Sequence, residues 1–120
     1  MDETKYSGAF QIIMNAGNSK SAALMAIEAA KDGDFMEAEE RLREAETEMR
    51  AAHQAQIDMI QQEAAGNPVN VNIILVHAQD HLTMAILAKD LAEQFVELYR
   101  QMSEMKQQMK QQMKQGNGTN

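Results

Sequence analysis

The chain contains no cysteine, which excludes disulfides, thiolate metal ligands and a cysteine nucleophile. It has one proline and six glycines among 120 residues, and aromatic residues make up 4%. No apolar run approaches the roughly 20 residues of a membrane-spanning helix, so direct membrane insertion is not expected. The polar start of the sequence is unlike a secretory signal, and together with the lack of cysteine it predicts a cytoplasmic protein.

Positive charge is also scarce. There are 11 Lys and Arg residues against 18 Asp and Glu, for a net charge of −7. Because a nucleic-acid binder needs a basic face for the phosphates, we expect no nucleic-acid partner. The abundant residues are Ala, Glu, Gln, Met, Lys and Leu, all strong helix formers. The composition therefore predicts an all-α fold.

Two breaks divide the sequence into three amphipathic segments. Residues 32–34 (Asp-Gly-Asp) end the first segment, with Gly33 beyond its last turn and Asp34 as the N-cap of the next. Residues 66–68 (Gly-Asn-Pro) end the second. Since short connections force neighbouring helices to run antiparallel, the sequence predicts an antiparallel up-down-up three-helix bundle. The predicted helices span about 4–31, 35–65 and 69–104 or beyond, within a single domain over 1–115, and 116–120 is expected to be disordered.

The third predicted helix is apolar on two sides. One face carries Ile73, Ala88, Leu91 and Phe95, and the opposite face carries Leu75, Leu82 and Ile86. A helix that is apolar all round must be covered all round, and two further helices of a small chain cannot readily do so. Self-association is therefore expected. Beyond this helix, 105–114 repeats Met-Lys-Gln-Gln with a period of four, which we interpret as a plain extension of the helix rather than an adhesive methionine stripe.

Titratable residues interrupt the first of these faces. His77, Asp80 and His81 are spaced as i, i+3 and i+4, so they share one side of the helix. Polar groups at a helix–helix seam are costly to bury without partners. Their presence predicts chemistry, or an ion, at this seam.

The segment 76–82 reads Val-His-Ala-Gln-Asp-His-Leu, which resembles the lactose/cellobiose-type enzyme IIA of the bacterial phosphoenolpyruvate:sugar phosphotransferase system. The similarity runs from about residue 8 to residue 100 and includes four further segments, 12–21, 31–35, 48–56 and 89–93. Members of this family are phosphotransferase components that carry a phosphoryl group on a histidine. They receive it from the general carrier HPr and pass it to a cysteine of the cognate enzyme IIB. Enzyme IIB then phosphorylates the sugar during its uptake through the membrane enzyme IIC. The sugars are of the lactose, cellobiose or chitobiose type.

The resemblance also implies roles for single residues. His77 is the expected phosphoryl acceptor and donor. The family forms a homotrimer around its third helices, with Asp80 of each subunit meeting at the three-fold axis around Mg²⁺ or a similar divalent cation. Three adjoining carboxylates would indeed repel strongly without a cation or protons between them, and oxygen ligands suit a hard ion.

The physical chemistry of the residues agrees with these roles. A neutral imidazole is nucleophilic near pH 7, and its phosphorylated form is labile enough to pass the group on. His81 lies one turn from His77 and is a candidate donor or electrostatic partner. Gln79 projects about 160° away from His77 on the same helix, so we expect it to reach that site from a neighbouring subunit.

Two other functions fit part of the pattern. One is a non-catalytic trimeric helical interaction module organised by a metal, which leaves a histidine beside the aspartate unexplained. The other is a small metalloenzyme bundle using His77, Asp80 and His81, which lacks a second ligand-bearing helix. The sequence does not identify the sugar, the particular enzyme IIB or the metal.

Overall fold

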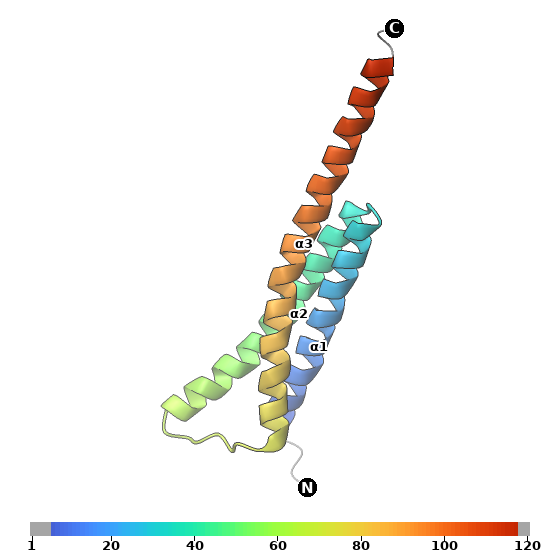
Figure 1. Ribbon diagram of the computed structural model, residues 1–120. Helices are drawn as coiled ribbons and strands as arrows, with labels where there is room; N and C mark the ends of the chain where they lie inside the picture. The colour runs from blue at the N-terminus through green and yellow to red at the C-terminus, as the bar shows by residue number, and fades with distance from the viewer. Residues whose placement is uncertain (1–5, 118–120) are drawn as a thin grey trace.

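Three long helices make up the computed structural model, which describes residues 6–117. They are α1 (Ser7–Lys31), α2 (Phe35–Ala64) and α3 (Ile73–Asn117), and the described part of the chain contains no strand. Successive helices run in opposite directions (Figure 1). The predicted all-α, up-down-up arrangement of three helices is confirmed.

The turn between α1 and α2 follows the predicted capping pattern. Gly33 has a φ of +83°, a left-handed conformation that glycine adopts without steric cost. The N–H of Gly33 donates to Ala30 O and that of Asp34 to Ala29 O, which satisfies carbonyls at the end of α1. The predicted Gly33 and Asp34 roles are therefore both present.

Asp34 caps α2 by accepting a hydrogen bond from the Glu37 backbone N–H at 3.1 Å. In a capping box the Glu37 carboxylate, three residues after the cap, would accept a hydrogen bond from the Asp34 backbone N–H. It bonds Arg41 instead, at 2.8 Å. The Asp34 N–H is already used by the end of α1, so that half of the capping box has no donor left.

The start of α3 differs from the prediction. α2 ends at Ala64, Gly66 takes a φ of +90°, and α3 begins at Ile73 rather than near residue 69. The side chain of Asn72 accepts the Leu75 N–H at 2.9 Å and so supplies the cap. The Asn72 cap therefore decides where α3 begins, although apolar residues also precede it.

The outer ends of α1 and α3 also differ from the prediction. Tyr6 precedes the first turn of α1, so that helix begins at Ser7. The predicted start near Thr4 lies outside the described residues. At the other end, Gly116 and Asn117 belong to the last turn of α3, which corrects the expectation of disorder for these two; 118–120 lie outside the described residues.

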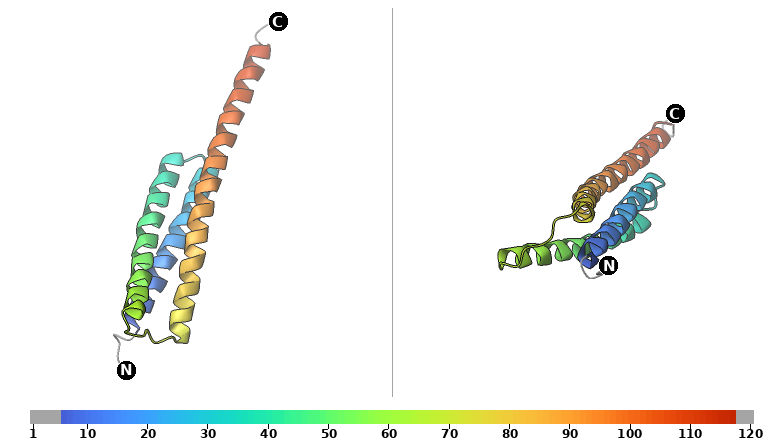
Figure 2. Two further views of the ribbon diagram at one scale, coloured as in Figure 1. Left: turned by 90° about the vertical axis from the view of Figure 1, so that its left-hand side faces the viewer. Right: turned by 90° about the horizontal axis from the view of Figure 1, so that it is seen from below.

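Helix α1 holds the bundle together. It packs extensively against both α2 and α3, whereas α2 and α3 touch each other much less. The C-terminal part of α2 diverges from the other two helices (Figures 1 and 2). The result is an elongated molecule of 80 × 25 × 19 Å.

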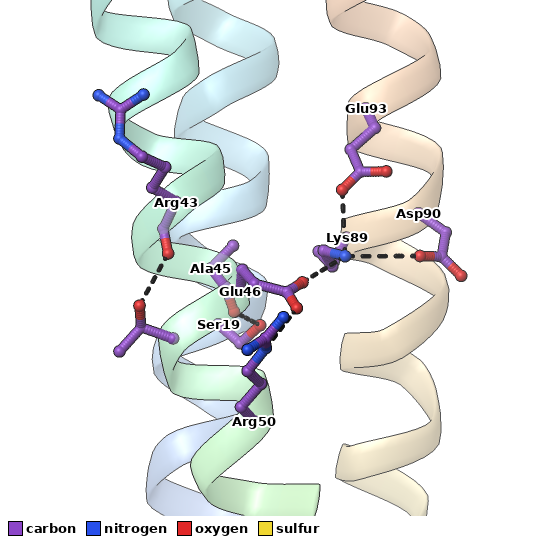
Figure 3. A network of polar contacts seen from close by, with 9 residues as sticks. Ser19, Arg43, Ala45, Glu46, Arg50, Lys89, Asp90 and Glu93 are labelled. Carbon is purple, nitrogen blue, oxygen red and sulfur yellow. Dashed lines mark hydrogen bonds and ion pairs between the residues drawn. The ribbon is translucent and has the colours of Figure 1, made fainter.

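The core consists mainly of alanine. Its fully buried large side chains are Ile12, Leu82 and Val96. Ser19 is buried with them, and its hydroxyl donates to the Ala45 carbonyl at 2.7 Å, which ties α1 to α2 (Figure 3). Small side chains let the helix backbones approach closely, but they remove little apolar surface from water.

Larger apolar side chains lie on the outside. On α3 the exposed ones are Ile73, Val76, Met84, Leu87, Leu91, Phe95, Leu98, Met102, Met105, Met109 and Met113. The expected opposite face is covered, with Leu82 buried and Leu75 and Ile86 half-buried. A single chain therefore covers one of the two predicted faces of α3 and leaves the His77 face open. A row of exposed large apolar side chains of this kind is typical of a site of association.

A polar network joins α2 to α3 at mid-height (Figure 3). Lys89 of α3 forms ion pairs with Glu46 of α2 and, at 3.0 Å, with Glu93. Arg50 bonds the same Glu46 at 2.7 Å. Hydrogen bonds from Lys89 and then Arg50 hold the pKa of the Glu46 carboxyl below its ordinary value. The bond to Glu46 raises the pKa of Lys89, against the opposing effect of its burial.

We expect Glu46→Gln to lower the free energy of unfolding at pH 7 by about 1 kcal/mol, the order found for partly exposed pairs. Because the carboxyl pKa is depressed in the folded state, this stabilisation is present above the unfolded pKa of about 4.3 and is lost as the pH falls through the lower folded value. Urea unfolding of both proteins from pH 7 to pH 3, at one protein concentration, measures this.

The matched control is Glu44→Gln. Glu44 pairs with Arg41 within α2, so its loss leaves the α2–α3 contact intact and should change little. A difference between wild type and Glu46→Gln that stays constant down to pH 3 would show that the charge of Glu46 is not what the network requires.

Candidate functional site

Two imidazole rings meet near the start of α3. Nε2 of His77 lies 3.1 Å from Nε2 of His81, within hydrogen-bond distance. The ring centroids are 4.4 Å apart and the planes cross at 84°, an edge-on contact. The i, i+4 spacing of a helix brings them together, as the sequence predicted.

The burial of neighbouring residues fixes the direction in which these two rings point. Ala78 and Leu82 each directly follow one of the histidines and are fully buried against the bundle. His77 is consequently turned outward and exposed, and His81 is half-buried. One nucleophilic ring thus faces solvent while a second ring, held closer to the core, touches it.

An apolar pocket of about 710 Å³ adjoins His77. α1 and α3 line it with Phe10, Ile13, Ile73, Ile74, Val76, His77, Gln79, Asp80 and Thr83. Phe10 is 56% exposed and Ile73 is 79% exposed, which is unusual for such large apolar side chains. This surface suits transient docking of a protein partner over the histidine.

Gln79 has a partner within its own chain. Its Oε1 accepts a hydrogen bond from Nε2 of Gln56 on α2, and the side chain is half-buried. The sequence favoured a role for Gln79 from a neighbouring subunit and gave no sign of the bond to Gln56. The Gln79 side chain also lines the His77 pocket. The structure therefore places Gln79 at the edge of the site, with its oxygen held by α2.

Asp80 is exposed on the outward side of α3 and lines the same pocket as His77. Among residues 6–117, no three His, Asp or Glu side chains cluster closely enough to hold a metal ion. The carboxylate is a suitable donor for a hard divalent cation, but one chain supplies one such donor at this place. A metal at Asp80 therefore requires carboxylates from other copies.

Residues distant in sequence complete the site. Phe10 and Ile13 come from α1 and Gln56 from α2, and none belongs to a recognisable motif with the histidines. Their contribution depends on how the helices cross. The available sequence signal was weak: Phe10 and Ile13 are apolar positions of the first amphipathic segment.

Comparison with known proteins identifies the class. Residues 7–100 match the family described as "PTS system, Lactose/Cellobiose specific IIA subunit". The lichenan-specific phosphotransferase enzyme IIA component of Bacillus subtilis is 44% identical over 94 residues, covering 78% of this chain and 86% of that protein. The chain therefore belongs to the lactose/cellobiose-specific IIA family and is a phosphotransferase-system enzyme IIA component.

Solved structures agree with this assignment. The cellobiose-specific enzyme IIA of Bacillus anthracis superposes with a TM-score of 0.84 at 39% identity, over 87% of this chain and 95% of that one. The IIA component in the complex of chitobiose IIA with HPr from Escherichia coli gives 0.72 at 30% identity, over 82% and 96%. None of the helices within residues 6–117 is long and apolar enough to cross a membrane.

The contact between the two imidazole rings restricts which ring nitrogens carry a proton, and this can be tested. One Nε2 must donate and the other accept, so in the neutral state the two rings cannot both carry their proton on Nε2. We expect ¹⁵N–¹H spectra at alkaline pH to show one ring of the pair protonated at Nε2 and the other at Nδ1. His53, exposed on α2, serves as the internal reference. Two Nε2–H rings in the pair would rule this contact out.

Proposed function

We propose that this protein carries a phosphoryl group on His77, receiving it from phosphorylated HPr and delivering it to a cysteine of its cognate enzyme IIB. The observation that carries the proposal is the exposed His77 ring, held at 3.1 Å from His81 at the edge of an apolar pocket. Membership of the IIA family supports it. As a phosphotransferase-system component, the protein would act in the cytoplasm.

The transfer needs little covalent machinery. The lone pair on Nε2 of His77 attacks phosphorus, a nitrogen–phosphorus bond forms, and the bond to the HPr imidazole breaks. In the second step the enzyme IIB thiolate attacks phosphorus and the His77 imidazole leaves. Because the contact with His81 occupies the same nitrogen in the resting site, His81 must release it before transfer. Its N–H can then donate to a phosphoryl oxygen and stabilise the charge.

The pocket provides the docking surface for both partners. HPr and enzyme IIB must each present their reacting atom to the same exposed ring, so they bind in turn and not together. The structural relative solved as a complex of chitobiose IIA with HPr supports HPr as the donor. Gln79, whose side-chain oxygen is held by Gln56, lines the same pocket and would contact the incoming partner.

The pocket does not identify the transported sugar, for a physical reason. A carrier of phosphoryl groups touches its protein partners and never the sugar, so its pocket need not resemble a sugar site. The relatives described above are named for lichenan, cellobiose and chitobiose. We therefore assign the protein to uptake of sugars of this class without choosing among them.

We further propose that the protein works as a homotrimer built on the open face of α3. This face is apolar along its length, and burying it would remove from water the Leu, Met and Phe side chains that a single chain exposes. Asp80 lies on the same face, so three-fold symmetry would gather three carboxylates. Mg²⁺ held by these carboxylates would relieve their repulsion and would have a structural role.

The first test is phosphorylation with purified components. After incubation with phosphoenolpyruvate, enzyme I and HPr, we expect the wild-type mass to rise by one phosphoryl group per chain, in a form lost on acid treatment. His77→Gln should show no gain. His81→Gln should still be phosphorylated but about tenfold more slowly, equivalent to about 1.4 kcal/mol of transition-state stabilisation.

His53→Gln is the matched control, because His53 is exposed on α2 and has no part in the proposed transfer. An unphosphorylated wild type, with folded protein and active HPr verified, would reject the carrier role. It would favour a metal-organised interaction module. Equal rates for His81→Gln and wild type would remove His81 from the mechanism.

Metal dependence tests the role of Asp80. A ligand that binds the folded assembly raises its stability, so we expect Mg²⁺ to raise the melting temperature of wild type and EDTA to lower it. Asp80→Asn should respond to neither, whereas Asp58→Asn, an exposed acid on α2, should behave as wild type. Equal Mg²⁺ responses in wild type and Asp80→Asn would contradict a metal at this position.

A further inference from the structure

Helix α3 continues well beyond the bundle. Its last fully buried side chain is Val96, and Arg100 closes the bundle by bonding Glu39 at 2.6 Å and lying 5.0 Å from the centre of the Phe35 ring. Every residue from 104 to 116 is exposed. This segment, here called the α3 extension, projects past the α1–α2 turn by about 20 Å, at about 1.5 Å per residue (Figure 1).

The side of α3 that faces the bundle loses its apolar character where the bundle ends. Inside the bundle the inward row is Ala78, Leu82, Ala85, Lys89, Ala92 and Val96. Continued in steps of three and four, the same row becomes Arg100, Ser103, Gln107, Lys110 and Lys114. Polar residues replace apolar ones at the point where α1 and α2 no longer cover the helix.

The opposite side does not change. Along the bundle the outward row is Met84, Leu87, Leu91, Phe95 and Leu98, all exposed. Continued past the bundle it becomes Met102, Met105, Met109 and Met113, also exposed, at 48%, 60%, 60% and 68%. The outward row therefore stays apolar over the whole helix, including the part with no bundle beside it.

This asymmetry indicates where a partner lies. A helix facing water on all sides needs no apolar row, and a lone helix of this length is marginally stable at best. We infer that the α3 extension forms a parallel coiled coil with the extensions of the other copies in the assembly. This inference rests on the self-association proposed above. The helix does continue through the Met-Lys-Gln-Gln repeat, as the sequence predicted, and the inference goes further by giving the methionines a partner.

The sequence of the extension favours copies of itself as the partner. Spacings of three and four residues along the outward row are those of a coiled-coil seam. In a parallel symmetric assembly each methionine meets its own equivalent at the same height. Lys110 and Lys114 lie on the inward row and point to solvent, whereas Lys106 lies between the two rows, at the flank of the methionines.

Because the chain has no cysteine, single introduced cysteines report these contacts directly. The test uses three full-length variants: Met109→Cys in the outward row of the extension, Gln107→Cys in its inward row, and Leu91→Cys in the outward row of the bundle. After mild oxidation, non-reducing electrophoresis should show dimers for Met109→Cys and Leu91→Cys. Gln107→Cys should give at least fivefold less cross-linked dimer than Met109→Cys. In a trimer the third chain has no partner and runs as monomer.

The outcomes separate the two proposals. Cross-linking of Leu91→Cys without excess cross-linking of Met109→Cys over Gln107→Cys would overturn the coiled coil and leave the assembly intact. Failure of both outward-row variants would overturn the assembly and the coiled coil together. If Met109→Cys fails to cross-link in solution while wild type co-sediments with anionic phospholipid vesicles, the extension is a membrane-surface helix and the inference is wrong.

Sedimentation equilibrium provides an independent measurement. Replacing Met105, Met109 and Met113 together by Gln should weaken subunit association at least tenfold. Replacing Lys106, Lys110 and Lys114 by Gln should not weaken it. Both variants alter exposed residues outside the bundle, so loss of folding does not confuse the comparison. Equal association constants for the methionine variant and wild type would overturn the coiled coil.

Discussion

The packing of α3 is the constraint on which the rest of this protein depends. One row of this helix is covered by α1 and α2, and the other carries most of the large apolar side chains on its surface. The covered row packs mainly against alanine, so a single chain removes little apolar surface from water. In the proposed trimer, much of the hydrophobic free energy available to this sequence would come from contacts between copies. Folding of the bundle and the proposed assembly around α3 would then be parts of one equilibrium.

This arrangement explains where the chemistry sits. His77 lies near the start of the open face, where α2 diverges. It adjoins two α1 side chains, Phe10, which is exposed, and Ile13, which is half-buried. A partner reaching this ring would meet the apolar pocket that α1 and α3 line. Farther along, the same face is free for contacts between copies. In the proposed scheme one helix would serve both assembly and transfer, with Asp80 of the assembly and His77 of the transfer site less than one helical turn apart.

Features that depend on neighbours in sequence could be predicted. Gly33, the Asp34 cap and the His77–His81 contact follow from turn chemistry and helical spacing, and each is present. Features that depend on how helices cross could not. The bond from Gln56 to Gln79 joins residues 23 apart in the sequence, and it required the approach of α2. The later start of α3 followed from a polar cap at Asn72, in a stretch whose apolar residues resemble the helix that follows.

The alanine core has a consequence for how this protein tolerates sequence change. In most cores the damaging substitutions remove atoms and leave a cavity. Ala23, Ala26, Ala38, Ala45 and Ala52 are completely buried between helices and have almost nothing to remove, so nearly every substitution there adds volume and pushes the backbones apart. Ser19 is equally confined, since a larger side chain would displace the carbonyl that its hydroxyl bonds. Steric overlap thus limits which substitutions the interior tolerates. On the open face of α3, by contrast, one large apolar side chain can replace another. Variation among related chains should accumulate on the outside of the helix before it reaches the inside.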